Sequence, residues 1–190
     1  MAAYYNRDGG CVAPTARVAL ANGTTKHAVD VRKGDVLSNG SRVKCAVAIK
    51  APEDGLEMVQ LKGGLWITPY HPVRAQEDPS SIVAASSKAA EWVFPIEAGS
   101  MRVEVKNRAD LPLIYSFVLD GEAQWLSIDG VDVVAMGHGL TDNAVVAHEF
   151  FGTSAIVEQL SQLEGYAEGS VVVGSWVRDR TTMRVVGLKV

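Results

Sequence analysis

The sequence has only two cysteines in 190 residues. Two thiols cannot form the disulfide framework of a small secreted domain, so free thiols are the simpler interpretation. The chain also lacks a long apolar run, because no stretch approaches the roughly 20 residues of a membrane-spanning helix. Its first ten residues, MAAYYNRDGG, have neither the basic nor the apolar region of a secretory signal. We therefore expect a cytoplasmic protein with no membrane partner.

Positive charge is scarce as well. The 18 Lys and Arg residues face 22 Asp and Glu residues, for a net charge of −4, and they form no basic stripe. Without a basic surface, the protein would not attract the negatively charged phosphate backbone of a nucleic acid, so nucleic acid is not an expected partner. The composition is that of an ordinary globular protein, with 47% hydrophobic and 21% charged residues. A chain of this length can bury one substantial core.

Short runs of alternating apolar and polar residues fill the chain from residue 11 to about residue 135. This period of two is typical of half-buried strands. Asn-Gly pairs at 22–23 and 39–40 predict tight hairpin turns in which both central residues have positive φ. A Ser- and Ala-rich segment at 77–92 interrupts the pattern and predicts a surface loop. The runs expected to form strands are TARVAL, HAVDV, RVKCAVAI, MVQL, LWIT, WVFPI, MRVEV, PLIYSFVL, WLSIDG and VDVVAM.

The last part of the chain has a different pattern. Residues 153–166 carry apolar side chains at helical spacing, with Thr153 or Ser154 as the N-cap and Gly165 at the end. The tail after residue 170 returns to period two on both sides of an RDRTT turn, which predicts a closing hairpin. The sequence thus predicts a mostly β fold with one C-terminal helix and a hairpin, over about 153–190.

Cys11 follows two glycines at the start of the first predicted strand. A thiolate is a strong nucleophile, and the carbonyl nearest to it in the sequence belongs to Gly10. Attack there would convert the Gly10–Cys11 amide into a thioester, and the absence of a side chain on Gly10 leaves the tetrahedral intermediate uncrowded. The departing nitrogen needs a proton, which an imidazole can supply. Thr68 and His71, three residues apart, offer a hydroxyl for the oxyanion and an imidazole for the nitrogen.

These residues and their surroundings resemble the Hint family, the Hedgehog and intein autoprocessing domains. The shared motifs are the Gly-Cys opening with V.L.NG, the VRKGDVL turn, TPYHP, and IYSFVLD...W.SIDG. The GHG...HEFFGT ending is most similar to the Vint subgroup, which occurs beside von Willebrand A modules. The resemblance extends from Cys11 to about Leu188. It implies a β-rich Hint-type horseshoe over residues 11–190, preceded at 1–10 by the remnant of an upstream segment.

By the same resemblance, Cys11 is the nucleophile, Gly10 the residue whose carbonyl is attacked, and Thr68 and His71 the activating pair. Inteins place an Asp after the Tyr of IYSF, where this chain has Ser116, so Asp120 is considered as a substitute acid.

The C-terminal chemistry of inteins has no counterpart here. Splicing inteins end in His-Asn followed by a nucleophile, whereas this chain has His148-Glu149-Phe150. Glutamate has no amide nitrogen for succinimide formation, so we expect no splicing. Cleavage of the first bond remains, with the thioester passing to water or another small nucleophile. The expected partner is the upstream part of the same polypeptide, for example a von Willebrand A module, and a monomer suffices for a reaction in cis.

Other interpretations stay open. The same departures fit a Hint-like fold that has lost its chemistry and serves as a binding or spacer module, and a Cys-His hydrolase acting in trans is a third option. His138, between two glycines, either lines the site or is an ordinary loop residue. A zinc site formed by His71, His138, His148 and a cysteine has a spacing that matches no compact ligand pattern, so no metal or other cofactor is expected. Cys45 is expected to fill the core.

Overall fold

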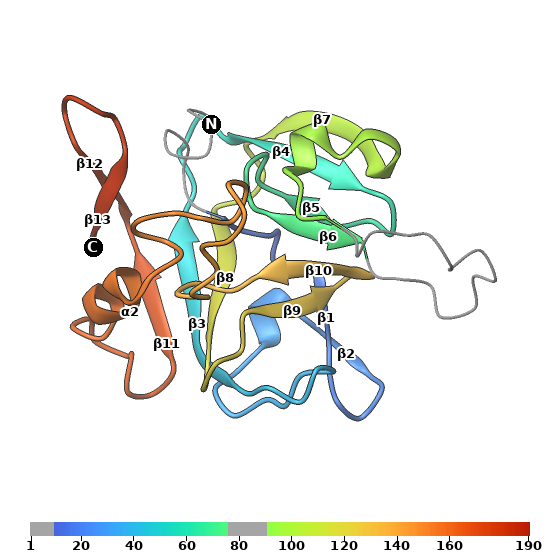
Figure 1. Cartoon of the computed structure of the whole chain (residues 1–190), viewed down its shortest axis with the longest axis horizontal. Coiled ribbons are helices and arrows are strands. Elements are labelled where there is room, and N and C mark those ends of the chain that lie inside the picture. The colour runs from blue at the N-terminus through green and yellow to red at the C-terminus, as the bar shows by residue number, and fades with distance from the viewer. Residues whose placement is uncertain (1–9, 76–90) are drawn as a thin grey trace.

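The computed structural model describes residues 10–75 and 91–190 (Figure 1). The expected upstream remnant, apart from Gly10, and most of the expected loop at 77–92 lie outside the described residues. The strands are β1 (Arg17–Ala19), β2 (Thr25–His27), β3 (Val43–Lys50), β4 (Leu56–Leu61), β5 (Trp66–Ile67), β6 (Val73–Ala75), β7 (Arg102–Arg108), β8 (Leu113–Leu119), β9 (Trp125–Ile128), β10 (Val131–Val134), β11 (Ser170–Val173), β12 (Ser175–Arg178) and β13 (Val185–Lys189). The helices are the 3₁₀ turns η1 (Ala28–Asp30), η2 (Pro95–Glu97) and η3 (Gly99–Met101), and the α-helix α2 (Ser154–Leu160).

The strands form several small sheets, as the short alternating runs predict. One sheet has the order β2-β1-β9-β10-β6, a second β11-β3-β8, and a third β5-β4-β7, while β12 and β13 pair with each other. Most neighbouring strands run antiparallel. The mostly β fold expected from the sequence is therefore confirmed.

The chain segment around Cys11 lies between two of these sheets. Val12 forms a bridge with Tyr115 of β8 on one side and with Ile67 of β5 on the other. The N–H of Val12 donates to the Tyr115 carbonyl at 2.8 Å, and the N–H of Ala13 donates to the Trp66 carbonyl at 2.9 Å. The Gly10–Cys11 peptide bond therefore lies directly before a segment that is hydrogen-bonded to strands of two sheets.

Two hydrophobic cores lie on opposite sides of this segment. Val12 belongs to one core, with residues of β1, β5 and β9, whereas Cys11 and Ala13 belong to the other, with residues of β3 and α2. Successive side chains of an extended chain point to opposite faces, so three residues reach both cores. The position of Cys11 is fixed by packing on both sides.

The Asn-Gly turns differ from the expected geometry. Gly23 and Gly40 have φ of 81° and 84°, but neither asparagine has positive φ. The side-chain oxygen of Asn22 accepts a hydrogen bond from the N–H of Thr24 at 3.0 Å, and that of Asn39 accepts from Ser41. Each asparagine thus stabilises its turn with its side chain rather than with a left-handed backbone.

Two expected strands form 3₁₀ turns instead. The HAVDV run ends β2 at His27 and continues as η1, and within WVFPI only Val93 makes a bridge, to Val73, before η2 begins. Pro95 opens η2 because its fixed φ suits a helical start and it has no N–H to give a strand partner.

The C-terminal elements include the helix and the hairpin that the sequence predicts, but their boundaries differ from the predicted ones. Thr153 is the N-cap of α2, and its hydroxyl accepts from the N–H of Ala155, but the helix ends at Leu160, before Gly165. β12 and β13 form the expected hairpin, whereas β11 joins the central sheet parallel to β3 (Figure 1). Within residues 10–75 and 91–190, no helix has both the length and the apolar character needed to cross a bilayer.

Candidate active site

Cys11 and Thr68 are joined by two hydrogen bonds. The N–H of Cys11 donates to the Thr68 hydroxyl oxygen at 3.0 Å, and the N–H of Thr68 donates to the Cys11 carbonyl at 2.9 Å. Thr68 directly follows β5, whose Ile67 pairs with Val12, so the pairing register brings the two residues together. The Thr68 hydroxyl oxygen is consequently aligned with the nitrogen of the Gly10–Cys11 bond.

His71 lies against the residue on the other side of that bond. A turn closed by the His71 N–H and the Thr68 carbonyl at 3.2 Å carries the imidazole back over Gly10. A methyl group built on Gly10 would come within 2.5 Å of His71 Cδ2 and 2.6 Å of Cγ. No side chain fits there, so the glycine before Cys11 is required by the position of the ring.

The protonation of His71 follows from its surroundings. Its Nε2 lies 2.9 Å from the Val134 carbonyl, which can only accept, so Nε2 carries the proton of the neutral ring and Nδ1 carries the lone pair. Burial lowers the pKa of His71 to about 4, although the Val134 carbonyl and the backbone of Cys11 act in the opposite direction. Near pH 7 the ring is neutral and has one nitrogen able to accept a proton.

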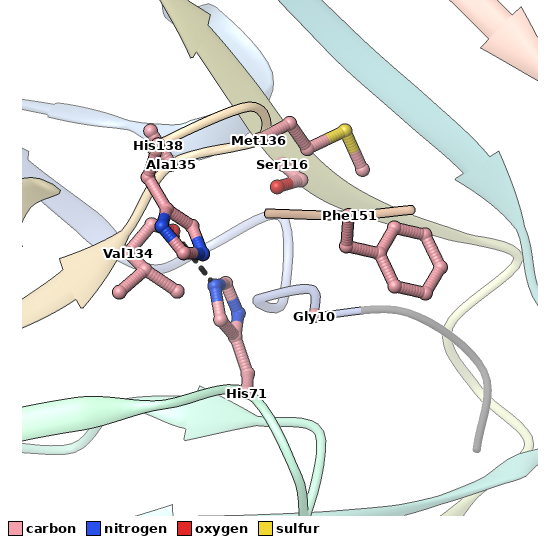
Figure 2. A pocket seen from close by; sticks show the side chains of 8 residues that line it. All are labelled: Gly10, His71, Ser116, Val134, Ala135, Met136, His138 and Phe151. Carbon is pink, nitrogen blue, oxygen red and sulfur yellow. Dashed lines mark hydrogen bonds between the residues drawn. The ribbon is translucent and has the colours of Figure 1, made fainter. Parts of the chain in front are cut away.

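A small pocket opens beside this junction (Figure 2). Its lining consists of Gly10, His71, Ser116, Val134, Ala135, Met136, His138 and Phe151. In Figure 2, His138 points across the pocket toward His71, and the Ser116 hydroxyl faces the same space. The structure therefore places His138 in the same pocket as Gly10 and His71.

His138 is held in a defined orientation. Its Nδ1 accepts a hydrogen bond from the N–H of Leu140 at 3.0 Å, and its side chain is 4% exposed. Burial lowers its pKa to about 4. Phe151 and Gly152 hold this loop in place, because the N–H groups of Gly137 and Gly139 donate to their carbonyls at 2.8 Å.

His148 is buried too, but it does not line the pocket. Its Nδ1 accepts from the N–H groups of Phe150 and Phe151, each at 3.0 Å, and so fixes the turn that places Phe151 on the pocket wall. Phe151 also packs edge-on against Trp176 of β12, with ring centroids 4.9 Å apart. Sequence reasoning missed the pocket-lining role of Phe151, and the adjacent aromatic residues Phe150 and Phe151, close after His148, are the signal that could have identified it.

Asp120 lies one residue beyond β8, is exposed, and is not among the pocket residues. Four residues of extended chain separate it from Ser116 by about 13 Å, too far to act at the same bond. Cys45 is fully buried in the second core, where burial raises the pKa of its thiol to about 11. Within the described ranges, no group of three or more His, Cys, Asp or Glu side chains could hold a metal ion.

Comparison with known families gives one assignment over nearly the whole chain. The family model named Vint, described as a Hint domain, matches residues 10–187. No curated protein matches the chain.

Three solved structures with some similarity are all inteins. A variant of the Ssp DnaB mini-intein is 12% identical with a TM-score of 0.45, and the match covers 68% of this chain and 95% of that one. The gp41-1 intein is 12% identical with a TM-score of 0.43, covering 67% and 98%. A DnaB intein from Synechocystis is 11% identical with a TM-score of 0.42, covering 67% and 99%.

Proposed function

The chain belongs to the Vint family of Hint domains, and on this premise we propose that it cleaves its own peptide bond between Gly10 and Cys11. The reaction passes through a thioester, occurs in cis, and releases the upstream part of the polypeptide. Its acyl acceptor is water or another small nucleophile. The upstream part, such as a von Willebrand A module, is the natural partner.

One observation carries the proposal: the His71 ring occupies the space where a side chain on Gly10 would be. This contact restricts the position before Cys11 to glycine. It has a clear chemical purpose, because it places an imidazole beside the bond that the cysteine would break.

The steps balance with the residues present. The Cys11 thiol gives its proton to Nδ1 of neutral His71, and the sulfur attacks the Gly10 carbonyl carbon. The resulting imidazolium returns this proton to the Cys11 nitrogen, the C–N bond breaks, and a thioester and a free amine remain. The acceptor then attacks the thioester, the C–S bond breaks, and the thiol is restored. Thr68, which accepts the amide N–H, holds the nitrogen in position throughout.

Splicing has no support from the residues near the pocket. His138 is followed by Gly139, and His148 by Glu149, so neither histidine precedes a carboxamide. A carboxamide nitrogen is what cyclisation of the second junction would need. The proposed reaction therefore ends with cleavage.

A second candidate is a binding or spacer module without chemistry, which is favoured by Ser116. This buried serine stands where the resemblance implies an acid, and a neutral hydroxyl cannot act as an acid or base at neutral pH. The third interpretation, a hydrolase acting in trans, is disfavoured, because the Cys11 side chain has no exposed surface for an external substrate.

The test is intact-mass spectrometry of the full chain incubated with and without dithiothreitol. We expect thiol-accelerated loss of the ten residues before Cys11, and no loss in Cys11→Ala. Cys45→Ala is the matched control, since it removes the other buried thiol and should leave cleavage intact. An unchanged mass for the parent chain in every condition would refute the proposal and favour the silent module.

A further inference from the structure

The proposed acyl shift needs a hydrogen-bond donor at the Gly10 carbonyl oxygen. When the sulfur attacks, negative charge develops on the Gly10 carbonyl oxygen, and a preorganised donor there is commonly the largest electrostatic contribution to such a reaction. The Thr68 hydroxyl oxygen accepts a hydrogen bond from the Cys11 N–H, at the nitrogen of the same peptide bond.

The tautomer of His138 identifies a donor in the same pocket. Its Nδ1 accepts the Leu140 N–H, so the proton of the neutral ring is on Nε2. This Nε2 is fully buried, and it has no hydrogen-bond partner in the part of the chain that the structure describes. A buried N–H without a partner costs about 1–3 kcal/mol, which favours a role in a state other than the one seen.

We propose that Nε2–H of His138 donates a hydrogen bond to the Gly10 carbonyl oxygen as it becomes an oxyanion during the acyl shift. The inference rests on the proposed cleavage at Gly10–Cys11. Gly10, His71 and His138 line one pocket, and the ring of His138 points into it (Figure 2). With Nδ1 engaged by Leu140, the neutral ring has no free lone pair, so His138 acts as an electrophile and not as a base.

The two pocket histidines therefore share the Nε2–H tautomer but differ in which nitrogen is left without a hydrogen bond. His71 donates its Nε2–H to the Val134 carbonyl, so its Nδ1 lone pair remains able to accept a proton. His138 accepts the Leu140 N–H at Nδ1, so its Nε2–H remains able to donate. One ring suits proton transfer at sulfur and nitrogen, and the other suits charge stabilisation at oxygen. Neither role can be exchanged without breaking a main-chain hydrogen bond.

Two substitutions of similar size separate this role from a structural one. His138→Gln keeps an N–H donor near the position of Nε2 but loses the acceptor for Leu140. His138→Asn keeps that acceptor and loses the distal donor. The readout is the rate of peptide release at saturating dithiothreitol, where the acyl shift limits the rate. We expect Asn to be about 100-fold slower than the parent chain and Gln to retain a rate within about tenfold of it.

A merely structural His138 would give the reverse order, with Asn faster than Gln, and that order would overturn the inference. The slowdown in Asn should also be the same from pH 5.5 to pH 8, because Nε2–H is present in both the neutral and the charged ring. A slowdown that changes with pH would instead identify a base and reject the donor role.

A second measurement is independent of cleavage. Long-range ¹H–¹⁵N spectra of the Cys11→Ala chain report which nitrogen of His138 carries the proton. We expect the Nε2–H form, and an Nδ1–H form would reject this inference while leaving the proposed cleavage standing. A parent chain that forms no thioester would reject both.

Discussion

His71 occupies the space into which a side chain on Gly10 would project. The orientation of the His71 ring thus requires a glycine at position 10, although the two residues are 61 positions apart in the sequence. It also lets the chemistry at the junction be tested by adding a single methyl group.

Gly10→Ala should slow thiol-induced cleavage by at least about tenfold, because the new methyl group would stand 2.5 Å from His71 Cδ2 and displace the ring. The rate of peptide release, followed by intact mass, is the measurement. Gly121→Ala is the control, since a methyl group there meets nothing within 4 Å, lies away from the pocket residues, and adds only left-handed backbone strain of about 1–2 kcal/mol. Equal rates for the two variants would contradict the expected displacement.

Thr68→Val should remove the acceptor for the Cys11 N–H while keeping the side-chain shape. The buried N–H then loses its partner, so the free energy of unfolding should fall by about 1–3 kcal/mol in urea titrations. Cleavage should slow as well, because the nitrogen is no longer held. Thr68→Ser keeps the hydroxyl and should recover most of both losses, and a serine variant as impaired as the valine variant would show that the methyl group matters more.

His148→Ala should loosen the turn that carries Phe151, since two main-chain N–H groups lose their common acceptor. We expect a loss of about 2 kcal/mol in the free energy of unfolding and faster reaction of Cys11 with a disulfide reagent. In His148→Asn, a short side-chain oxygen can accept from the same two N–H groups, two and three residues ahead. Thiol reactivity and stability close to those of the parent chain are the expected results for the asparagine variant.

Stability should decrease as the pH falls from about 6.5 to about 4. Burial lowers the pKa of His71, His138 and His148 to about 4 each, from an ordinary value of 6.5. In this range the unfolded chain binds more protons than the folded one, so acid favours unfolding, and the full stability is present above pH 6.5. Three such groups give a slope of up to about 4 kcal/mol per pH unit.

Urea titrations between pH 8 and pH 5 measure this slope. The carboxylates whose pKa values are lowered, such as Asp35, titrate below 3.8 and contribute outside this window. His148→Asn removes one of the three groups and should reduce the slope by about a third. A constant midpoint from pH 7 to pH 5 would mean that the rings are charged or exposed.

The type of fold was predictable from local sequence. Alternation identified most strands, and the Gly-Cys pair and the Thr-x-x-His motif are each visible as a local signal, although 57 residues separate Cys11 from Thr68. The turns were only partly predictable. Asp129 and Gly130, with φ of 48° and 83°, form the kind of turn expected at the Asn-Gly pairs, whereas the sequence pattern places this Asp-Gly pair at the end of the predicted strand WLSIDG.

Long-range pairing explains what the sequence did not indicate. β11 runs parallel to β3, more than 120 residues away in the chain, and parallel pairing leaves no local turn signal. Likewise, the two glycines around His138 were the only local sign in the sequence that separated it from His148 as a candidate to line the pocket. The difference arises from main-chain hydrogen bonds between the 137–139 loop and the 151–152 turn, which bring two distant segments together.

The hydrogen bonds around Val12 have a consequence for the fate of the molecule after reaction. The bonds that hold Cys11, Val12 and Ala13 to β5, β8 and Thr68 all lie on the C-terminal side of the Gly10–Cys11 bond. Breaking that bond therefore removes none of them, and the new amino terminus stays anchored between the two sheets. Under the proposed cleavage, the domain would keep its architecture, and an upstream polypeptide would depart without any unfolding of the domain that released it.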